Sequence, residues 1–312
     1  MPRRTLVTGA SGFVGRQTLG PLAAAGVEVH AVGHRRPQHE AGDVHWHDVD
    51  LLDQAARRAL VRSVRPELVL HLAWEARHGL FWTAPSNLSW VAATLSLLRE
   101  ASEAGAQRFV GVGTCMEYGD SATACDDENT SPLVPLTLYG VCKDACRRAA
   151  EEFAAMQRVS FAWARLFLLY GPGEAPDRLL PTVVRQLLSG EAAPITSGRA
   201  VRDFMDVRDA GAALAALALS NVRGAVNVAS GRALSVREVV EMLARLAERP
   251  ELVRVGALPD RDEPARLVAS VARLFEEVGY RDVRSLKTGL LQALDDWRSR
   301  TPSKPLKTAT SQ

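Results

Sequence analysis

The glycine-rich stretch TGASGFVG constrains the fold of this chain more than any other part of its sequence. It follows a short β-rich run, Arg3–Thr8, and opens a segment, Gly12–Ala25, that has the pattern of a helix. In such a turn Gly9 permits a sharp reversal, Gly12 lets a pyrophosphate approach the backbone, and Gly15 lets helix and strand pack closely. Free N–H groups and the positive end of the helix dipole then face the phosphates. The residues predicted to contact a dinucleotide here are Gly9, Ser11, Gly12, Phe13, Val14 and Gly15.

Strand and helix patterns alternate through the first half of the chain. Further strands are predicted at Val27–Val32, Glu67–Leu72, Arg108–Gly113 and Val159–Phe167. Helices are predicted between them at Leu51–Val64, Leu88–Ala104 and Leu138–Met156. Strands joined by helices of this length form parallel βαβ units with helices on both faces of the sheet. The predicted fold class is therefore α/β: a Rossmann-type doubly wound parallel sheet with a smaller C-terminal α/β substrate domain.

The pattern changes after Tyr170. Prolines, glycines and loops interrupt Gly171–Arg202, and the strand-like segment Gly224–Ser230 is expected to return to the sheet. Helices at Ser235–Ala247 and Leu286–Arg298 are expected to close a smaller unit. We therefore expect a dinucleotide-binding domain over residues 1–168, with a return segment near 203–230. Residues 169–300 then form mainly a substrate-binding domain, and the polar tail 301–312, which holds two prolines, is expected to be disordered.

Composition and charge exclude several classes of protein. The 312 residues carry a formal net charge of +2, which leaves no footprint for nucleic-acid binding. No apolar run approaches the roughly 18–20 residues of a membrane span, and the start of the chain lacks the pattern of a signal peptide. The cysteines and histidines do not have the spacing of a zinc site. We expect a cytoplasmic protein with reduced thiols, no metal, no nucleic-acid partner and no membrane partner.

The end of the second predicted strand indicates which dinucleotide binds. An acidic residue there would hold the ribose 2′-hydroxyl of NAD, but the sequence continues as VGHRR. Guanidinium groups match a 2′-phosphate well, so we predict NADP(H), with contacts from His34, Arg35 and Arg36. The alternative is that both arginines are ordinary loop charges. Asp48 and Val49, after the strand-like stretch VHWH, are predicted to border the adenine.

The stretch YGVCK places Tyr139 and Lys143 one turn apart on the same face of a predicted helix. Lys143 is the only lysine among the first 286 residues, where arginine otherwise supplies the positive charge. A tyrosine with a pKa near ~10 is a poor base, but a nearby ammonium lowers that pKa. The tyrosine can then exchange a proton with a carbonyl or alcohol oxygen while hydride moves at carbon. Thr114, at the end of the fourth strand, faces the same crevice and can polarise that oxygen.

Together these motifs resemble those of the extended short-chain dehydrogenase/reductase family, of the NAD-dependent epimerase/dehydratase type, whose members act on nucleotide sugars. The resemblance covers residues 3 to about 298. The matching stretches are TGASGFVG, HLA, GTCMEYG, YGVCK, RLFLLYGPG, RDFMDVRDAG and NVASG. It implies a catalytic trio of Thr114, Tyr139 and Lys143. It also implies cofactor contacts from Tyr139, Lys143 and, in the HLA motif, Leu72 and Ala73.

The resemblance further implies that the domain at 169–300 binds a nucleotide sugar. Arg202 matches a position that contacts the sugar nucleotide, and Arg261, in the stretch DRDEP, loosely matches a diphosphate-binding arginine. The resemblance also implies a homodimer built from the helices Leu88–Ala104 and Leu138–Met156.

Several departures from the family pattern narrow the chemistry. Dehydratases of the family carry an Asp-Glu pair directly after the Ser or Thr, where this chain has Cys115 and Met116, and decarboxylases carry a glutamate at the second of these positions. Cys115 and Met116 are expected to border the substrate without moving protons. Glu117 comes one residue later, and on an extended segment that shift points it the other way. Leu168 replaces a frequent asparagine, so one polar substrate contact is lost or replaced.

Aromatic residues follow the HLA motif in a loop that should border the substrate. Trp74 is predicted to contact the substrate, and together with Phe81 and Trp82 it could pack against a deoxygenated sugar. The alternative is that these rings form the core of a lid.

The leading functional hypothesis is NADPH-dependent reduction of the 4-keto group of an NDP-4-keto-6-deoxyhexose, with the proton supplied by Tyr139. It is based on the intact trio, the missing dehydratase acids and the basic end of the second strand. The alternative is an NDP-hexose 4-epimerase with bound NAD. A hypothesis of another class, a non-catalytic NADP-binding sensor, is disfavoured because both Tyr139 and Lys143 are present.

Overall fold

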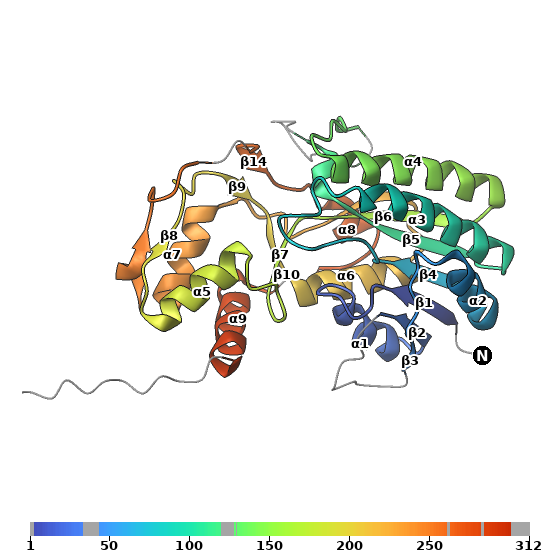
Figure 1. The fold of residues 1–312 in the computed structure, drawn as a ribbon, viewed down its shortest axis with the longest axis horizontal. Coiled ribbons are helices and arrows are strands. Elements are labelled where there is room, and N and C mark those ends of the chain that lie inside the picture. Colours follow the sequence, from blue (N-terminus) through green and yellow to red (C-terminus); the bar gives the residue numbers. More distant parts are fainter. Residues whose placement is uncertain are drawn as a thin grey trace, which may run out of the picture.

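The computed structural model describes residues 3–33, 44–119, 128, 130–260, 263–281 and 284–300. Figure 1 shows two groups of elements side by side, a sheet flanked by helices on one side and a smaller group of helices and short strands on the other.

The larger group is built on a seven-stranded sheet in the order β11-β6-β5-β4-β1-β2-β3. Each neighbouring pair is parallel. The strands are β1 (Arg4–Thr8), β2 (Glu28–Val32), β3 (Val44–His47), β4 (Leu68–His71), β5 (Arg108–Thr114), β6 (Ser160–Leu166) and β11 (Gly224–Val228). The order reverses between β1 and β4, which creates a crevice at their carboxyl ends. The predicted Rossmann-type parallel sheet is confirmed, including the return of the strand near residue 224.

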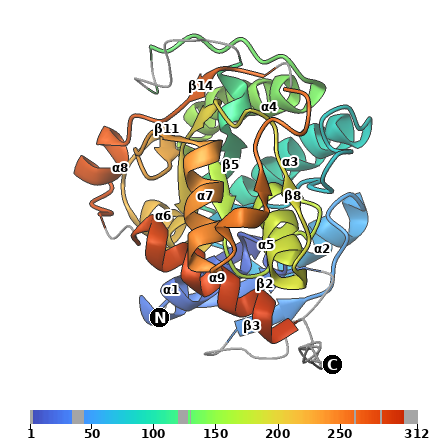
Figure 2. The same cartoon turned by 90° about the vertical axis from the view of Figure 1, so that its left-hand side faces the viewer.

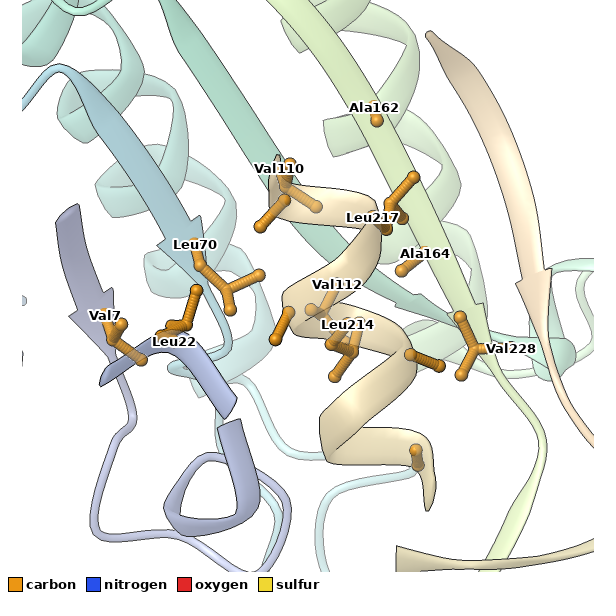
Figure 3. Close-up of a cluster of buried hydrophobic side chains, with 14 of the residues drawn as sticks. Val7, Leu22, Leu70, Val110, Val112, Ala162, Ala164, Leu214, Leu217 and Val228 are labelled. Carbon is orange, nitrogen blue, oxygen red and sulfur yellow. The ribbon is translucent and has the colours of Figure 1, made fainter. Parts of the chain in front are cut away.

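Helices cover both faces of this sheet. One face is covered by α1 (Arg16–Ala24), α6 (Val207–Leu219) and α8 (Ala272–Glu276), and the other by α2 (Gln54–Val64), α3 (Ser86–Glu103) and α4 (Leu138–Gln157). Figure 3 shows Leu214 and Leu217 of α6 lying against valines and alanines of the central strands. Both faces of the central strands β4, β5 and β6 are therefore buried, which explains why their sequences are mostly apolar.

A separate core lies in the smaller group. It is formed by α5 (Leu179–Ser189), α7 (Val236–Leu246) and α9 (Leu286–Arg300), which pack together in Figure 2. The capping box of Ser235 and Glu238 fixes the start of α7, because each side chain bonds the other's backbone N–H. Helix α5 falls in the segment predicted to be loops. Pro181 stands in its first turn, where a missing N–H costs no helical hydrogen bond.

Short strands connect the two groups. β7 (Leu168–Tyr170) pairs with β10 (Phe204–Asp206), and β9 (Val201–Arg202) lies between β12 (Leu234–Ser235) and β14 (Arg266–Leu267). A further pair is β8 (Ala193–Pro194) with β13 (Val253–Arg254), and two 3₁₀ turns are η1 (Cys115–Glu117) and η2 (Pro250–Leu252). Because β6 runs through Phe167 into β7, the carboxyl ends of the sheet face the smaller group. Among the described residues, no helix is long and apolar enough to cross a membrane.

Candidate active site

The glycine turn after β1 leaves no room for side chains. Gly9 has φ +67°, a conformation that favours glycine, and a β-carbon on it would lie 2.8 Å from the backbone nitrogen of Ala73. A β-carbon on Gly15 would overlap the carbonyl oxygen of Gly9. The predicted helix start at Gly12 is wrong, because residues 12–15 form turns and α1 begins at Arg16. The resulting cradle of backbone next to a helix N-terminus fits the pyrophosphate of a dinucleotide.

The HLA motif, His71 to Ala73, ends β4 and lies next to the glycine turn, where it is bonded to the end of β1. His71 lies between two hydroxyl groups, with Nδ1 2.7 Å from Thr8 Oγ1 and Nε2 2.8 Å from Thr94 Oγ1. Burial lowers the pKa of His71 to about 3, with the charges of Lys143 and Arg57 acting in the same direction, so the ring is neutral. Thr8 Oγ1 also accepts a hydrogen bond from the N–H of Ala73. The histidine thus acts as a structural link, a role that sequence reasoning missed.

The predicted adenine end of the site lies beside the glycine turn. The N–H of Ala10 donates to Val32 O at 2.9 Å, and Gly33 lies against the side chain of Ser11. Asp48 and Val49 follow β3, next to the carboxyl end of β2. The residues predicted to select NADP(H), namely His34, Arg35 and Arg36, lie outside the described residues.

Thr114 and Tyr139 meet at the carboxyl end of β5. Thr114 is the last residue of β5, Tyr139 lies in the first turn of α4, and the Thr114 side chain lies close enough to the phenol to act on its pKa. Thr137 caps α4 by accepting from the N–H of Gly140, and the N–H of Tyr139 donates to Trp82 O. Burial raises the pKa of Tyr139, and the Thr114 side chain and the charge of Arg178 oppose that shift. The phenol is therefore protonated at neutral pH.

Lys143 lies one turn beyond Tyr139 and is buried. Its ammonium donates to Val112 O at 2.7 Å and lies 3.8 Å from the centre of the Trp74 ring. The distance from Nζ to the centre of the Tyr139 ring is 5.9 Å. Burial lowers the pKa of Lys143 to about 8, whereas Cys146 and Glu117 act to raise it. The ammonium is thus held beside the phenol by groups that the predicted trio does not include.

Glu117 turns inward instead of toward the crevice. Its carboxylate accepts hydrogen bonds from Arg165 Nε at 2.8 Å, Trp163 Nε1 at 2.9 Å and the N–H of Thr114 at 3.0 Å. The last of these is half of a capping box that begins η1 at Thr114. Since all these partners are internal, Glu117 supports the site structurally.

Cys115 and Met116 lie in η1, between Thr114 and Glu117. Burial raises the pKa of the Cys115 thiol to about 12, so it stays protonated, and Met116 packs against the apolar cluster around Tyr118 and Phe167. Neither side chain can exchange protons with a ligand near neutral pH.

Aromatic side chains from the loop after β4 brace the Tyr139–Lys143 face of α4. The Phe81 ring packs edge-on against Tyr139 at 4.8 Å between centres, and Trp82 lies at 6.0 Å. Trp74 lies over Lys143, as described above. In this structure the aromatic loop therefore contacts α4 directly.

Arginines of the smaller group border the same crevice. Arg202 is buried, and its guanidinium lies 2.9 Å from the carboxylate of Glu263 and donates to Val201 O. The positive charge of Arg202 acts to lower the pKa of the Cys115 thiol. Arg178 lies just before α5, and its charge acts to lower the pKa of the Tyr139 phenol. Sequence reasoning missed Arg178 because it lies in no recognisable motif. Arg261 lies outside the described residues, and among those that are described no cluster of His, Cys, Asp and Glu could hold a metal ion.

Comparison with known proteins identifies the family. Residues 5–229 match the NAD dependent epimerase/dehydratase family. The chain belongs to this family. The match spans β1 through β11, and so includes the whole sheet that carries the glycine turn and the Thr114–Tyr139 pair.

Relatives within the epimerase/dehydratase family differ in the reaction they catalyse. A GDP-6-deoxy-D-mannose reductase from Pseudomonas aeruginosa is 30% identical over 96% of this chain and 99% of its own length. A dTDP-6-deoxy-L-talose 4-dehydrogenase (NAD(+)) from Aggregatibacter actinomycetemcomitans is 29% identical over 76% of this chain and 87% of its own. A UDP-glucose 4-epimerase from Thermus thermophilus, solved in complex with NAD, superposes with a TM-score of 0.84 at 25% identity, covering 96% of this chain and 100% of that one. These similar proteins are named as a reductase, a dehydrogenase and an epimerase. Membership of the family therefore does not decide which reaction this chain catalyses.

Proposed function

We propose that this protein is an oxidoreductase that uses NADP(H) to reduce the 4-keto group of an NDP-4-keto-6-deoxyhexose, in the biosynthesis of deoxysugars. The observation that carries the proposal is that Thr114, at the end of β5, lies beside Tyr139 in the first turn of α4, with Lys143 one turn further along the helix. The pair lies at the carboxyl end of β5, on the side of the sheet where the glycine cradle would hold the dinucleotide. Its relatives act on nucleotide sugars, as their names state.

In this reaction Tyr139 donates its phenolic proton to the ketone oxygen. Burial supports that direction, because it keeps the phenol protonated until a substrate accepts the proton. The Thr114 hydroxyl hydrogen-bonds the same oxygen and polarises the carbonyl. The Lys143 ammonium stabilises the phenolate that remains. A bound NADPH would supply the hydride to the carbonyl carbon.

Elimination of water is disfavoured by the residues after Thr114. A dehydratase needs an acid and a base there, and this chain offers a protonated thiol and a thioether at Cys115 and Met116. The nearby carboxylate of Glu117 is engaged by Arg165, Trp163 and the backbone of Thr114. These contacts support a reaction that needs only the proton of Tyr139.

The preference for NADP(H) rests on the sequence after β2. Gly33 follows the strand without an acidic residue, and His34, Arg35 and Arg36 come next. Guanidinium groups there would pair with a 2′-phosphate. The test is the ratio of kcat/KM for NADPH and NADH, before and after Arg35→Glu and Arg36→Glu. A wild-type preference for NADH would refute NADP(H) as the cofactor.

In this proposal the smaller group of elements binds the nucleotide part of the substrate. Arg178, Arg202 and Arg261 would provide positive charge for the diphosphate, with residues 169–300 as the substrate domain and 1–168 as the cofactor domain. We also propose a homodimer through the outer faces of α3 and α4, where Leu88 and Met156 are 61% and 77% exposed. A mass measurement in solution on the wild type and on Met156→Glu would test that interface.

A 4-epimerase with bound NAD is the second candidate, and the likeness to the NAD-bound epimerase structure favours it. The deciding experiment follows NADPH oxidation with a panel of TDP-, CDP-, GDP- and UDP-4-keto-6-deoxy sugars. Oxidation with one of them, lost in Tyr139→Phe, supports the reductase. No oxidation with any, together with interconversion of a UDP-hexose pair, would establish the epimerase instead.

A further inference from the structure

The buried ammonium of Lys143 lies between a backbone carbonyl and an aromatic ring, and the centres of the Tyr139 and Trp163 rings are further away, each 5.9 Å from Nζ. Val112 O accepts its hydrogen bond at 2.7 Å, and the Trp74 ring faces it with the ring centre 3.8 Å from Nζ. This distance lies well within the range of about 6 Å at which an aromatic face attracts a cation. The lysine is only 4% exposed, so water supplies little of its solvation.

The Trp74 ring is held in place by a second layer of contacts. Its indole N–H donates to Asn87 Oδ1 at 2.8 Å, and Asn87 is completely buried. The amide nitrogen of Asn87 donates in turn to Phe81 O and Ala84 O, both at 2.8 Å. Trp90 stacks at 6.3 Å between ring centres. The start of α3 and the loop before it thus fix the orientation of the ring over Lys143.

Several titratable groups surround this ammonium. His71 on β4 is neutral, Glu117 on η1 is engaged by Arg165, and Cys146 and Tyr139 lie on α4 itself. Glu117 and Cys146 favour the charged form of the lysine, and burial opposes it. The electron-rich face of the Trp74 indole also favours the charged form of the lysine, and it does so without adding another titratable group to the site.

We propose that Trp74 is a positioning residue for Lys143, which holds the ammonium charged and aimed beside Tyr139 by a cation–π contact. The sequence predicted a substrate contact for Trp74, and it did not indicate this contact with Lys143. The role of Trp74 rests on the proposed function for the part that Lys143 plays in catalysis. The contact between the ring and the ammonium is independent of which sugar is reduced.

The chain allows a direct test, because Lys143 is one of only four lysines. In protein labelled with ¹³C at the lysine ε-carbon, the spectrum contains four lysine signals, and Lys143→Arg identifies the relevant one. Its titration is followed in the wild type, Trp74→Phe and Trp74→Leu. Trp46→Leu is the matched control, since it makes the same change on β3, the edge strand of the sheet furthest from β6 and α4.

We expect the midpoint for Lys143 to fall by about 0.4 to 1.5 pH units in Trp74→Leu, which keeps an apolar side chain but removes the aromatic face. Trp74→Phe should fall between Trp74→Leu and the wild type, and it provides the comparison if the leucine variant does not fold. Trp46→Leu should leave the midpoint in place. A midpoint unchanged in both Trp74 variants, or shifted equally by Trp46→Leu, would overturn the proposal.

Turnover supplies the second measurement. In Trp74→Leu the alkaline loss of kcat for NADPH oxidation should begin at a lower pH by the same shift, since the uncharged lysine cannot stabilise the phenolate. Because the lysine titration needs no substrate, the two proposals can fail separately. A shifted titration in an enzyme that reduces no 4-keto sugar would refute only the proposed reaction. An active reductase with an unshifted titration would refute only the role of Trp74.

Discussion

Arg165 and Glu117 form an ion pair beneath the candidate active site, with Nε 2.8 Å from the carboxylate and both side chains almost completely buried. Removing one partner of a buried pair leaves the other charged and without compensation. Glu117→Ala should therefore lower the free energy of unfolding by about 3–5 kcal/mol, measured by denaturant titration. Glu103→Ala removes an exposed pair with Arg99 and should cost less than about 1 kcal/mol. Similar losses in the two variants would contradict this assignment.

The hydroxyl pair of Thr114 and Tyr139 predicts the effect of removing the phenolic oxygen. Tyr139→Phe should lower kcat by about 10² to 10⁴, the usual contribution of a positioned acid. Tyr280→Phe is the control, because that hydroxyl donates to Asp209 away from the crevice. Steady-state kinetics measure kcat in both variants. Undiminished turnover in Tyr139→Phe would exclude Tyr139 as the proton donor.

The packing of Gly15 under the Gly9 carbonyl predicts a steric effect on cofactor binding. Gly15→Ala should weaken binding of the nicotinamide dinucleotide at least about tenfold and destabilise the fold by about 1–3 kcal/mol, because the turn must shift to admit a methyl group. Gly20→Ala lies in α1, the helix that follows Gly15, with nothing within 4 Å of the added carbon. It should bind normally and gain about 0.5–1 kcal/mol. Fluorescence titration and thermal melting test both variants.

Glu174 predicts a dependence of stability on pH. Burial among Leu180, Val184 and Trp297 raises its pKa to about 8, although Arg178 and a backbone hydrogen bond near Gly171 act to lower it. Between pH 4.5 and about 8 the folded state holds a proton that the unfolded state has lost, so stability falls as pH rises through that window.

Glu174→Gln removes this titration. Its melting temperature should match the wild type near pH 4.5 and exceed it by on the order of 5 °C at pH 9. Exposed Glu191→Gln should follow the wild type at every pH. A constant difference between Glu174→Gln and the wild type across the pH range would show that the carboxyl does not titrate as described.

The sheet and the glycine turn could be predicted because their signals are local. Each strand predicted in the first half is present within two residues at either end, since apolar runs, turns and helix patterns alternate along the chain. The spacing of Tyr139 and Lys143 likewise indicated a shared helix face. Helix α5 was missed because its proline was interpreted as a break, whereas a proline in the first turn is compatible with a helix.

Most residues around the site could not be predicted, because they come together only through contacts between distant parts of the chain. Trp74 and Lys143 are joined only after β4 and α4 pack together, so no spacing in the sequence indicates their contact. Arg178 approaches Tyr139 from the smaller group in the same way. The inward turn of Glu117, by contrast, had a local signal, because the sequence TCME has the spacing of a capping box.

Strand β11 comes from residues 224–228, yet it pairs with β6, which ends at Leu166. The polypeptide must therefore cross the smaller group before it can complete the sheet. During synthesis on a ribosome, β6 remains an unpaired edge until the later strand has emerged, and such an edge can pair with other nascent chains. A fragment ending at residue 168 would keep that edge permanently, so the cofactor-binding part should be produced with β11 included or as the whole chain.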